Sequence, residues 1–472
     1  MKYNTLYKAV ALGISIMGAV ASAHADDQAV TGSGASFNLG EVKLTLGGFV
    51  AAEAYDRSRD QGADIGSSFT AIPLAGSDAN HLSNFGMTAR QSRLSLLIQG
   101  PAIEGFSPEA YYEGDFLGAA PTANSKQSNS YTPRVRQIFA DFKTDYGLTV
   151  LGGQAWSLAT QNKNGIEARG ENVPMTIDAQ YVPGFVWTRN PQLRVTEKFN
   201  DMITAGVSLE SPQAIPANAA AVKTAGTVVT TVAGSSNNYS GTNYTTDTMP
   251  DVIAKVALDP GFGHYEVLGI ARQFRDRVDP TVGGAAAGTN SRGSGVGFGA
   301  NFIMPIVPKF LDFQGSILSG KGVGRYGDSQ LADYTTHQDG TISAVSTTSA
   351  LLGLVAHPMP ALSLYAYAGM DKAGRDDQSN GGTGNYGYGS VNANNATCTA
   401  VAANGASCAD SQVKQLTVGG WYKFYQGTMG NMQTGLQFSH TTVDTFSGLN
   451  GIAPTANMNV YMVSFRYYPF QK

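Results

Sequence analysis

The residues best suited to chemistry are arginines and acids that alternate with apolar residues in strand-like segments between 86 and 198. In each segment, the residues that alternate with the apolar ones lie on the other face of the expected strand. These residues are Arg93, Arg134, Arg136, Arg194, Gln192, Glu113 and Asp115. Guanidinium groups stay charged and bind carboxylates through paired hydrogen bonds, and rings of arginine are one way in which a pore favours anions. Two interpretations stay open: the arginines guide anions, or the acids neutralise them in a polar lumen.

A polar stretch from 157 to 183 separates two of these segments and shows no sustained helical apolar stripe. It carries four charged residues: Glu167, Arg169, Glu171 and Asp178. A loop of this length inside a compact domain is usually functional or disordered. We predict that it is a constriction loop, which folds into the bore of a barrel and brings its acids opposite the arginines.

Alternation with a period of two recurs along the whole chain. In 42–55 the even positions are apolar and several odd positions are polar, as in a half-buried strand. Each such segment is long enough for a tilted strand to cross a bilayer. Sixteen can be marked, at about 42–55, 86–100, 105–119, 131–143, 146–156, 184–198, 201–211, 250–259, 263–277, 293–305, 309–320, 347–357, 361–371, 412–425, 430–441 and 458–470.

The connections between these segments alternate between long and short. The short ones carry Gly, Pro, Asn or Asp, which supply the dihedral angles of tight turns. A water-soluble sandwich has no reason to place every long connection at one end, whereas an outer-membrane barrel does. The sequence therefore predicts an all-β fold: a closed transmembrane antiparallel β-barrel of about sixteen strands, with long extracellular loops and short periplasmic turns.

The N-terminus resembles a secretory leader. Lys2 and Lys8 precede an apolar run at 9–23, and small residues precede the first acid, Asp26. We expect cleavage after Ala25, a short periplasmic segment at 26–41 and the barrel at 42–472. The expected location is the outer membrane of a Gram-negative bacterium, reached by export through the periplasm.

Composition excludes several classes of protein. Without the leader the formal net charge is −6, from 29 basic and 35 acidic residues, which does not suit a nucleic-acid binder. The 22 Tyr and 21 Phe argue against disorder. Cys398 and Cys408 are the two cysteines, and their spacing in an exported chain predicts a disulfide. The histidines form no metal spacing and no GxSxG motif occurs, so we expect no cofactor, no metal and no enzymatic reaction.

A second basic cluster contains Arg272, Arg275 and Arg277, where alternation is too poor to say which side chains point inward. We place it at the extracellular rim. Arg90 has the opposite parity to Arg93, and we predict that it faces a neighbouring subunit.

Five motifs resemble the DcaP-like family of outer-membrane porins: TARQSRLSLLIQGP at 88–101, YYEGDFLG at 111–118, RVRQIFADF at 134–142, LGGQAWSL at 151–158 and WTRNPQLRVT at 187–196. The resemblance implies trimeric, sixteen-stranded porins for small anionic molecules, dicarboxylates among them, with Arg93, Arg136 and Arg194 at pore-lining positions. Some members carry a helical periplasmic segment. Here only about 15 residues separate the expected cleavage site from the first strand.

These observations predict a channel for passive diffusion of small hydrophilic, preferentially anionic solutes. The expected partners are two further copies of the chain, outer-membrane lipid with lipopolysaccharide, and the solutes. The alternative is a structural or adhesin-type barrel whose long extracellular loops bind ligands.

Overall fold

The structure is a computed structural model. It describes residues 35–66, 68–118, 132–178, 181–217, 223–224, 227–230, 245, 247–280, 288–337, 339–379, 381–402, 405 and 407–471. The expected leader and most of the segment 26–41 therefore lie outside the described residues.

Sixteen antiparallel spanning strands form one closed barrel within the described part of the chain. Every strand pairs with its neighbour in sequence, and β2 pairs with β24 to close the cylinder, from Val50 opposite Tyr467 to Arg57 opposite Val460. The strands are β2 Val42–Arg57, β3 Asn84–Thr88 with β4 Arg93–Gln99 as two parts of one strand, β5 Phe106–Gly118, β6 Thr132–Thr144, β7 Leu148–Trp156, β8 Arg189–Lys198, β9 Ile203–Glu210, β12 Asp251–Leu258, β13 His264–Pro280, β14 Thr289–Val307, β15 Leu311–Lys321, β18 Ser346–Met359, β19 Leu362–Ala373, β22 Asp410–Gly427, β23 Gly430–Thr445 and β24 Thr455–Tyr468. The predicted fold class and strand count are confirmed.

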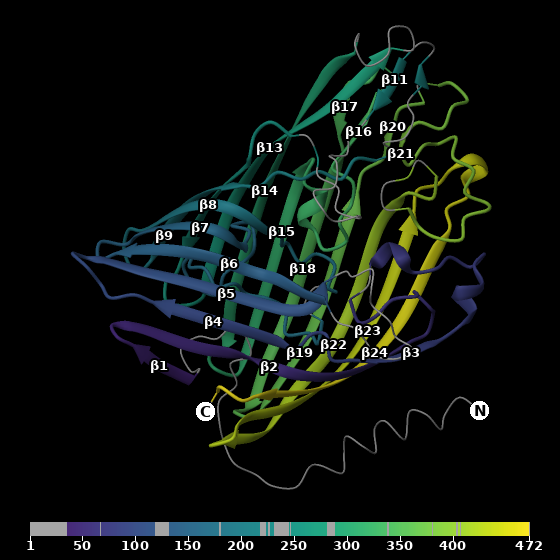
Figure 1. Cartoon of the computed structure of the whole chain (residues 1–472). Helices are drawn as coiled ribbons and strands as arrows, with labels where there is room; N and C mark the ends of the chain where they lie inside the picture. The colour runs from purple at the N-terminus through teal and green to yellow at the C-terminus, as the bar shows by residue number, and fades with distance from the viewer. Residues whose placement is uncertain are drawn as a thin grey trace, which may run out of the picture.

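Short strands and 3-10 turns lie at both ends of the barrel (Figure 1). β1 Ala35–Leu39 lies within the predicted segment 26–41 and pairs with the first residues of β2, beyond the point where β24 pairs. The loops contain β10 Lys223–Thr224, β11 Thr227–Thr230, β16 Tyr334–Thr336, β17 Ile342–Ala344, β20 Asp376–Asp377 and β21 Gly387–Tyr388, and the 3-10 turns η1 Phe69–Ala71, η2 Asp78–His81, η4 Gly324–Tyr326 and η5 Leu449–Gly451. No helix among the described residues is long and apolar enough to cross a membrane.

The outer face of the barrel is apolar over its middle. Side chains that alternate with buried neighbours are largely exposed there, including Val50, Leu94, Leu193, Val207, Val267, Phe298, Leu352, Leu436 and Phe465. A polar lumen behind an apolar exterior suits a cylinder in lipid, because every backbone group of a closed sheet finds a partner within the protein.

Much of the interior is filled by loops. One apolar cluster joins residues 65–74 and 177–185 to inward side chains of β19, β22, β23 and β24. Its members include Ile65, Phe69, Ile177, Tyr181, Tyr365, Tyr367, Trp421 and Met458. The sequence predicted an inward fold for 157–183 but not for the first long connection, 58–83, whose apolar residues pack in the same cluster.

On another sector of the wall, buried ion pairs fill the space. Lys255 Nζ lies 3.0 Å from Glu266 Oε1, and Arg272 Nη1 lies 2.7 Å from Asp333 Oδ1. Asp333 belongs to the connection between β15 and β18, which therefore also folds inward. An open space remains on the side of the barrel formed by β2 to β6 and β24.

Candidate functional site: an arginine-lined cavity

A cavity lies between the wall of β2 to β6, the end of β24 and the loop 157–183. It contains about 1090 Å³ of space not occupied by atoms and is partly open to solvent. Its charged lining residues are Arg93, Glu113, Asp115, Arg136, Arg169, Glu171, Asp178 and Arg466. The lining thus carries equal numbers of positive and negative residues. The sign of the charge that a solute contacts therefore depends on which of these side chains are more exposed.

Alternation positions most of this lining, and a β-bulge completes it. Glu113 pairs with Gln137 but the next residue of β5, Gly114, pairs with Val135, so β6 carries one extra residue, Arg136. Arg136 and Gln137 are therefore both buried on the inner side. The bulge also reverses the parity beyond it. Ile138 is 54% exposed and Phe139 is 5% exposed, whereas unbroken alternation after Arg134 and Arg136 would place Phe139 on the outer face.

The arginines and acids of β4, β5 and β6 form one network. Arg136 donates from Nε to Glu113 Oε1 at 2.5 Å and from Nη1 to Asp115 Oδ2 at 3.0 Å. Arg134 donates from Nε to Asp115 Oδ1 at 2.9 Å and from Nη2 to Asp115 Oδ2 at 2.6 Å. Arg93 is held more loosely, with Nη1 3.7 Å from Glu113 Oε2. The predicted residues on these three strands therefore come together, and neutralising pairs do form.

Arg466 of β24 is a central member of the site that sequence reasoning missed. It donates from Nη2 to Glu53 Oε1 at 2.9 Å, to Gln91 Oε1 at 2.9 Å and to the carbonyl of Ile177 at 2.7 Å. A signal was present: alternation of apolar residues in the last segment places Arg466 inward. Pro469, three residues later, makes the parity of this segment ambiguous from the sequence alone.

Aromatic rings separate the guanidinium groups along the wall. Arg93 and Arg466 both lie over the ring of Phe49, at 5.3 and 4.7 Å from its centroid, and Arg466 also lies 4.5 Å from the Trp421 ring centroid. Arg136 lies 5.9 Å from the Trp156 ring centroid. Such contacts hold a cation in place without neutralising it.

The loop 157–183 crosses the lumen and is fixed to the opposite wall. Asn172 donates to Gln314 Oε1 at 2.7 Å, the Ile177 amide donates to Gln437 Oε1 at 2.7 Å, and Trp421 Nε1 donates to the carbonyl of Met175 at 2.7 Å. Residues 173–178 therefore form the face of the cavity opposite the arginines.

Close packing of backbone holds the loop's end. Gly184 has φ +83°, and a Cβ there would lie 2.0 Å from the carbonyl oxygen of Ala350 in β18. A Cβ on Gly369 of β19 would lie 1.8 Å from the carbonyl oxygen of Pro183. Both positions therefore require glycine for the loop to approach the wall this closely.

The four charged loop residues are placed differently from one another. Glu171 and Asp178 line the cavity but are each only 6% exposed, and burial raises the pKa of the Glu171 carboxyl. Arg169 points back to the wall, where Nη2 lies 3.5 Å from Glu109 Oε2 and the guanidinium covers the Tyr111 ring. Glu167 is exposed and does not line the cavity.

Arg194 and Gln192 lie behind the loop rather than at the cavity surface. Gln192 donates to the carbonyls of Ala155 and Trp156, and Arg194 donates to Gln192 Oε1 at 3.0 Å and to the carbonyl of Trp156. Both are buried and neither lines the cavity. Their inward direction agrees with strand parity, but their contacts support the start of the loop.

Arg90 bonds within its own chain. It donates to Asp64 Oδ2 at 3.2 Å and to the carbonyls of Phe116 and Gly118 at 3.0 Å each. These bonds tie the connection 58–83 to the end of β5, so the prediction that Arg90 faces a neighbouring subunit is replaced by an internal role.

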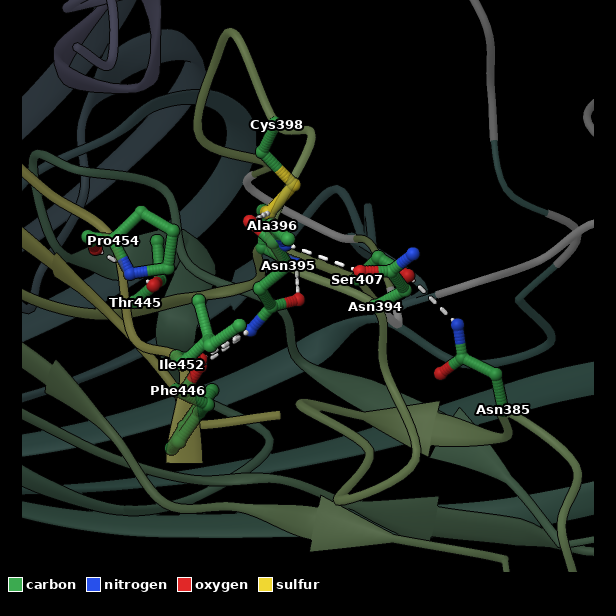
Figure 2. The surroundings of a disulfide bond; sticks show 11 residues. Asn385, Asn394, Asn395, Ala396, Cys398, Ser407, Thr445, Phe446, Ile452 and Pro454 are labelled. Carbon is green, nitrogen blue, oxygen red and sulfur yellow. Dashed lines mark hydrogen bonds between the residues drawn. A yellow bond between two sulfur atoms is a disulfide. The ribbon is translucent and has the colours of Figure 1, made fainter. Parts of the chain in front are cut away.

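Cys398 and Cys408 form a disulfide in the long connection between β19 and β22. Figure 2 shows Asn395 beside it, which donates to the carbonyls of Phe446 and Ile452 in the next long connection. The Leu74 amide donates to the carbonyl of Thr399 at 3.0 Å. The disulfide therefore lies where three long loops meet.

A closed sixteen-stranded barrel with a loop folded across its lumen is the architecture of outer-membrane channels. No family model and no curated relative matches this chain. Among solved structures it is similar to the outer membrane channel DcaP of Acinetobacter baumannii, at 16% identity over 90% of this chain and 97% of that one, with a TM-score of 0.60. This likeness agrees with the resemblance seen in the sequence motifs, and at this identity it establishes the fold.

Two further solved structures cover nearly the whole chain at lower similarity. One is an anion-selective porin from Comamonas acidovorans, at 12% identity over 91% of this chain and 100% of that one, with a TM-score of 0.45. The other is OmpF of Salmonella typhi in complex with daunomycin, at 10% identity over 92% and 100%, with a TM-score of 0.48.

Proposed function

We propose that this protein is a porin of the bacterial outer membrane, through which small hydrophilic solutes diffuse passively, with a preference for anions such as dicarboxylates. The exposure of the ion pairs around the cavity carries this proposal. In three of these pairs the side chain of the cation is more exposed than that of its acid. Side-chain exposure is 27% for Arg93 against 5% for Glu113, 30% for Arg134 against 1% for Asp115, and 9% for Arg466 against 0% for Glu53.

In this arrangement the positive groups are closer to the cavity than the negative groups that balance them. The acids lie in the wall behind the guanidinium groups, and the loop acids Glu171 and Asp178 are buried. A solute in the cavity therefore meets guanidinium groups on one side and residues 173–178 of the loop on the other. Two carboxylates of one solute can bind successive arginines, since guanidinium forks pair with carboxylates.

Arg93 offers the most informative substitution. Its Nε atom has no hydrogen-bond partner among the described residues, and Arg136 remains to neutralise Glu113 when Arg93 is replaced. We expect Arg93→Gln to lower the chloride-over-potassium permeability ratio, measured as the reversal potential of the purified protein in a planar bilayer under a salt gradient. Lys309→Gln removes one positive charge from an exposed turn outside the cavity and is the matched control.

An unchanged reversal potential in the Arg93 variant would remove the arginine face as a selectivity element. Absence of any single-channel conductance in the wild-type protein would favour the structural or adhesin-type barrel instead. A small dicarboxylate added to one side should interrupt the wild-type current more often than a monocarboxylate of equal length.

We also infer assembly as a homotrimer, and this rests on the resemblance in sequence. Native mass spectrometry of the detergent-solubilised protein measures the number of copies directly, and a monomer would contradict the inference.

A further inference from the structure

The arginines of the second basic cluster point to opposite sides of the wall. Arg272 is buried inside, where it donates to Asp251 Oδ2 at 3.0 Å and to Asp333 Oδ1 at 2.7 Å. Arg275 and Arg277 have the opposite parity and lie on the outer face of β13. The structure thus divides a cluster that sequence pattern left undivided.

Arg275 lies directly opposite Arg292 of β14 in the strand register. Both side chains are on the outer face, and Arg292 is exposed. Cross-strand partners on one face have Cβ atoms about 4.5–5.5 Å apart, and like charges in this position destabilise a sheet. Neither arginine has a hydrogen bond or ion pair with any residue that the structure describes. Two adjacent cations therefore lie outside the barrel with no ion pair among the described residues.

The outward residues on the same two strands show where Arg275 and Arg292 lie relative to the apolar belt of the barrel. On β13 the outward residues below it are Gln273, Ala271, Gly269, Val267 and Tyr265, and on β14 they are Ser294, Val296, Phe298, Ala300 and Phe302. This end of β13 and β14 is the end of the barrel that carries the long connections. On each strand one polar outward residue, Gln273 or Ser294, separates the arginine from the apolar outward residues, so Arg275 and Arg292 lie just above the apolar belt on the extracellular side. Arg277 stands one step higher and donates to Asn290 Oδ1 at 3.1 Å.

A shallow apolar hollow marks the outer surface lower on the same sector. Its lining comes from β8, β9, β12, β13 and β14 and includes Val195, Ala205, Gly206, Ala254, Val267, Gly269 and Phe298. The small side chains leave a depression between larger neighbouring side chains. A flexible hydrocarbon chain can occupy such a hollow.

We propose that Arg275 and Arg292 bind a phosphate group of a lipid A-type glycolipid in the outer leaflet, and that the hollow below receives one of its acyl chains. This rests on the proposed location in the outer membrane. A phosphate between two guanidinium groups replaces their mutual repulsion by charge-assisted hydrogen bonds, and arginine suits bidentate recognition of phosphate. Basic side chains at a membrane surface add attraction to anionic lipid headgroups.

The test uses the full-length protein in neutral detergent and bis-phosphorylated lipid A as the probe. Native mass spectrometry counts bound lipid across a titration. We expect Arg275→Gln/Arg292→Gln to bind lipid A at least about tenfold more weakly than wild type. The double variant Lys198→Gln/Lys309→Gln removes the same charge from exposed positions at the other end of the barrel and should bind like wild type. Lipid A from which the phosphates have been removed should bind both variants and wild type alike.

Equal lipid A binding by wild type and the arginine variant overturns the proposal, as does equal weakening in the lysine control. If the arginine variant instead changes the number of copies in the assembly, the pair serves contact between subunits and the proposal is also overturned. Single-channel conductance of the arginine variant should equal that of wild type. Absence of any conductance in the wild-type protein would contradict the channel function but not the lipid site, so the two failures are distinguishable.

Discussion

Arg466 Nη2 lies 2.7 Å from the backbone carbonyl oxygen of Ile177, so the last strand of the barrel directly holds the loop that crosses the lumen. The same guanidinium neutralises Glu53 of the first spanning strand, which is 1% exposed. One side chain therefore links the closure of the barrel to the position of the loop in the lumen.

Replacement of Arg466 by Gln should affect both features. It leaves Glu53 buried without its cation, which costs about 3–5 kcal/mol where a buried pair is broken. It also releases the carbonyl of Ile177, so we expect larger and noisier single-channel conductance together with a lower melting temperature. The double variant Glu53→Gln/Arg466→Gln removes the uncompensated charge and should recover stability but not the quiet conductance. Recovery of both would show that Arg466 has no separate role in holding the loop.

A methyl group on Gly369 should push the loop away from β19. Its Cβ would lie 1.8 Å from the carbonyl oxygen of Pro183, which is backbone and cannot turn aside. We expect Gly369→Ala to lower the melting temperature and to increase proteolytic cleavage within 157–183. Gly152→Ala adds the same methyl group to another strand where nothing lies within 4 Å, and it should behave like wild type. Similar behaviour of the two variants would contradict the close approach of loop and wall.

The sequence predicted the barrel because its strand pattern is local: residues two apart face the same side, and one clean segment reveals its own parity. The network of Arg93, Glu113, Asp115 and Arg136 could be assembled from such parities. Two kinds of feature could not. The bulge at Arg136 depends on pairing between strands, and the inward fold of 58–83 depends on apolar contacts of Ile65 and Phe69 with distant strands.

The bulge can be tested by cysteine labelling. If parity reverses after Arg136, Ile138→Cys faces lipid and Phe139→Cys is buried inside. We expect a membrane-soluble maleimide to label the Ile138 variant quickly and the Phe139 variant slowly in lipid vesicles. The native cysteines are joined as a disulfide and should not react. The reverse order of labelling rates would place Phe139 on the outer face, as unbroken alternation predicts.

The disulfide should stabilise the meeting point of the long loops rather than the barrel. Closing a loop of this size restricts the unfolded chain by an amount worth about 2–4 kcal/mol. We expect Cys398→Ser/Cys408→Ser to be cleaved faster by protease in 374–409 and in 58–83, because the Leu74 amide bonds to the carbonyl of Thr399. The far-ultraviolet circular dichroism should stay that of a β-barrel. Protease resistance equal to wild type would show that the loops are held without the disulfide.

Glu171 gives the loop a dependence on pH whose sign follows from burial. Burial raises the pKa of this carboxyl above its ordinary value of 4.5. Between the ordinary and the raised pKa the folded protein holds a proton that the unfolded chain has lost, so stability falls as pH rises through that window. We expect the melting temperature of Glu171→Gln, relative to wild type, to increase as pH is raised from about 4.5 to neutrality, because glutamine cannot ionise. Glu167→Gln changes an exposed acid four positions earlier in the same loop and should follow wild type at every pH. A constant difference between Glu171→Gln and wild type across the range would show that Glu171 titrates alike in the folded and unfolded chain.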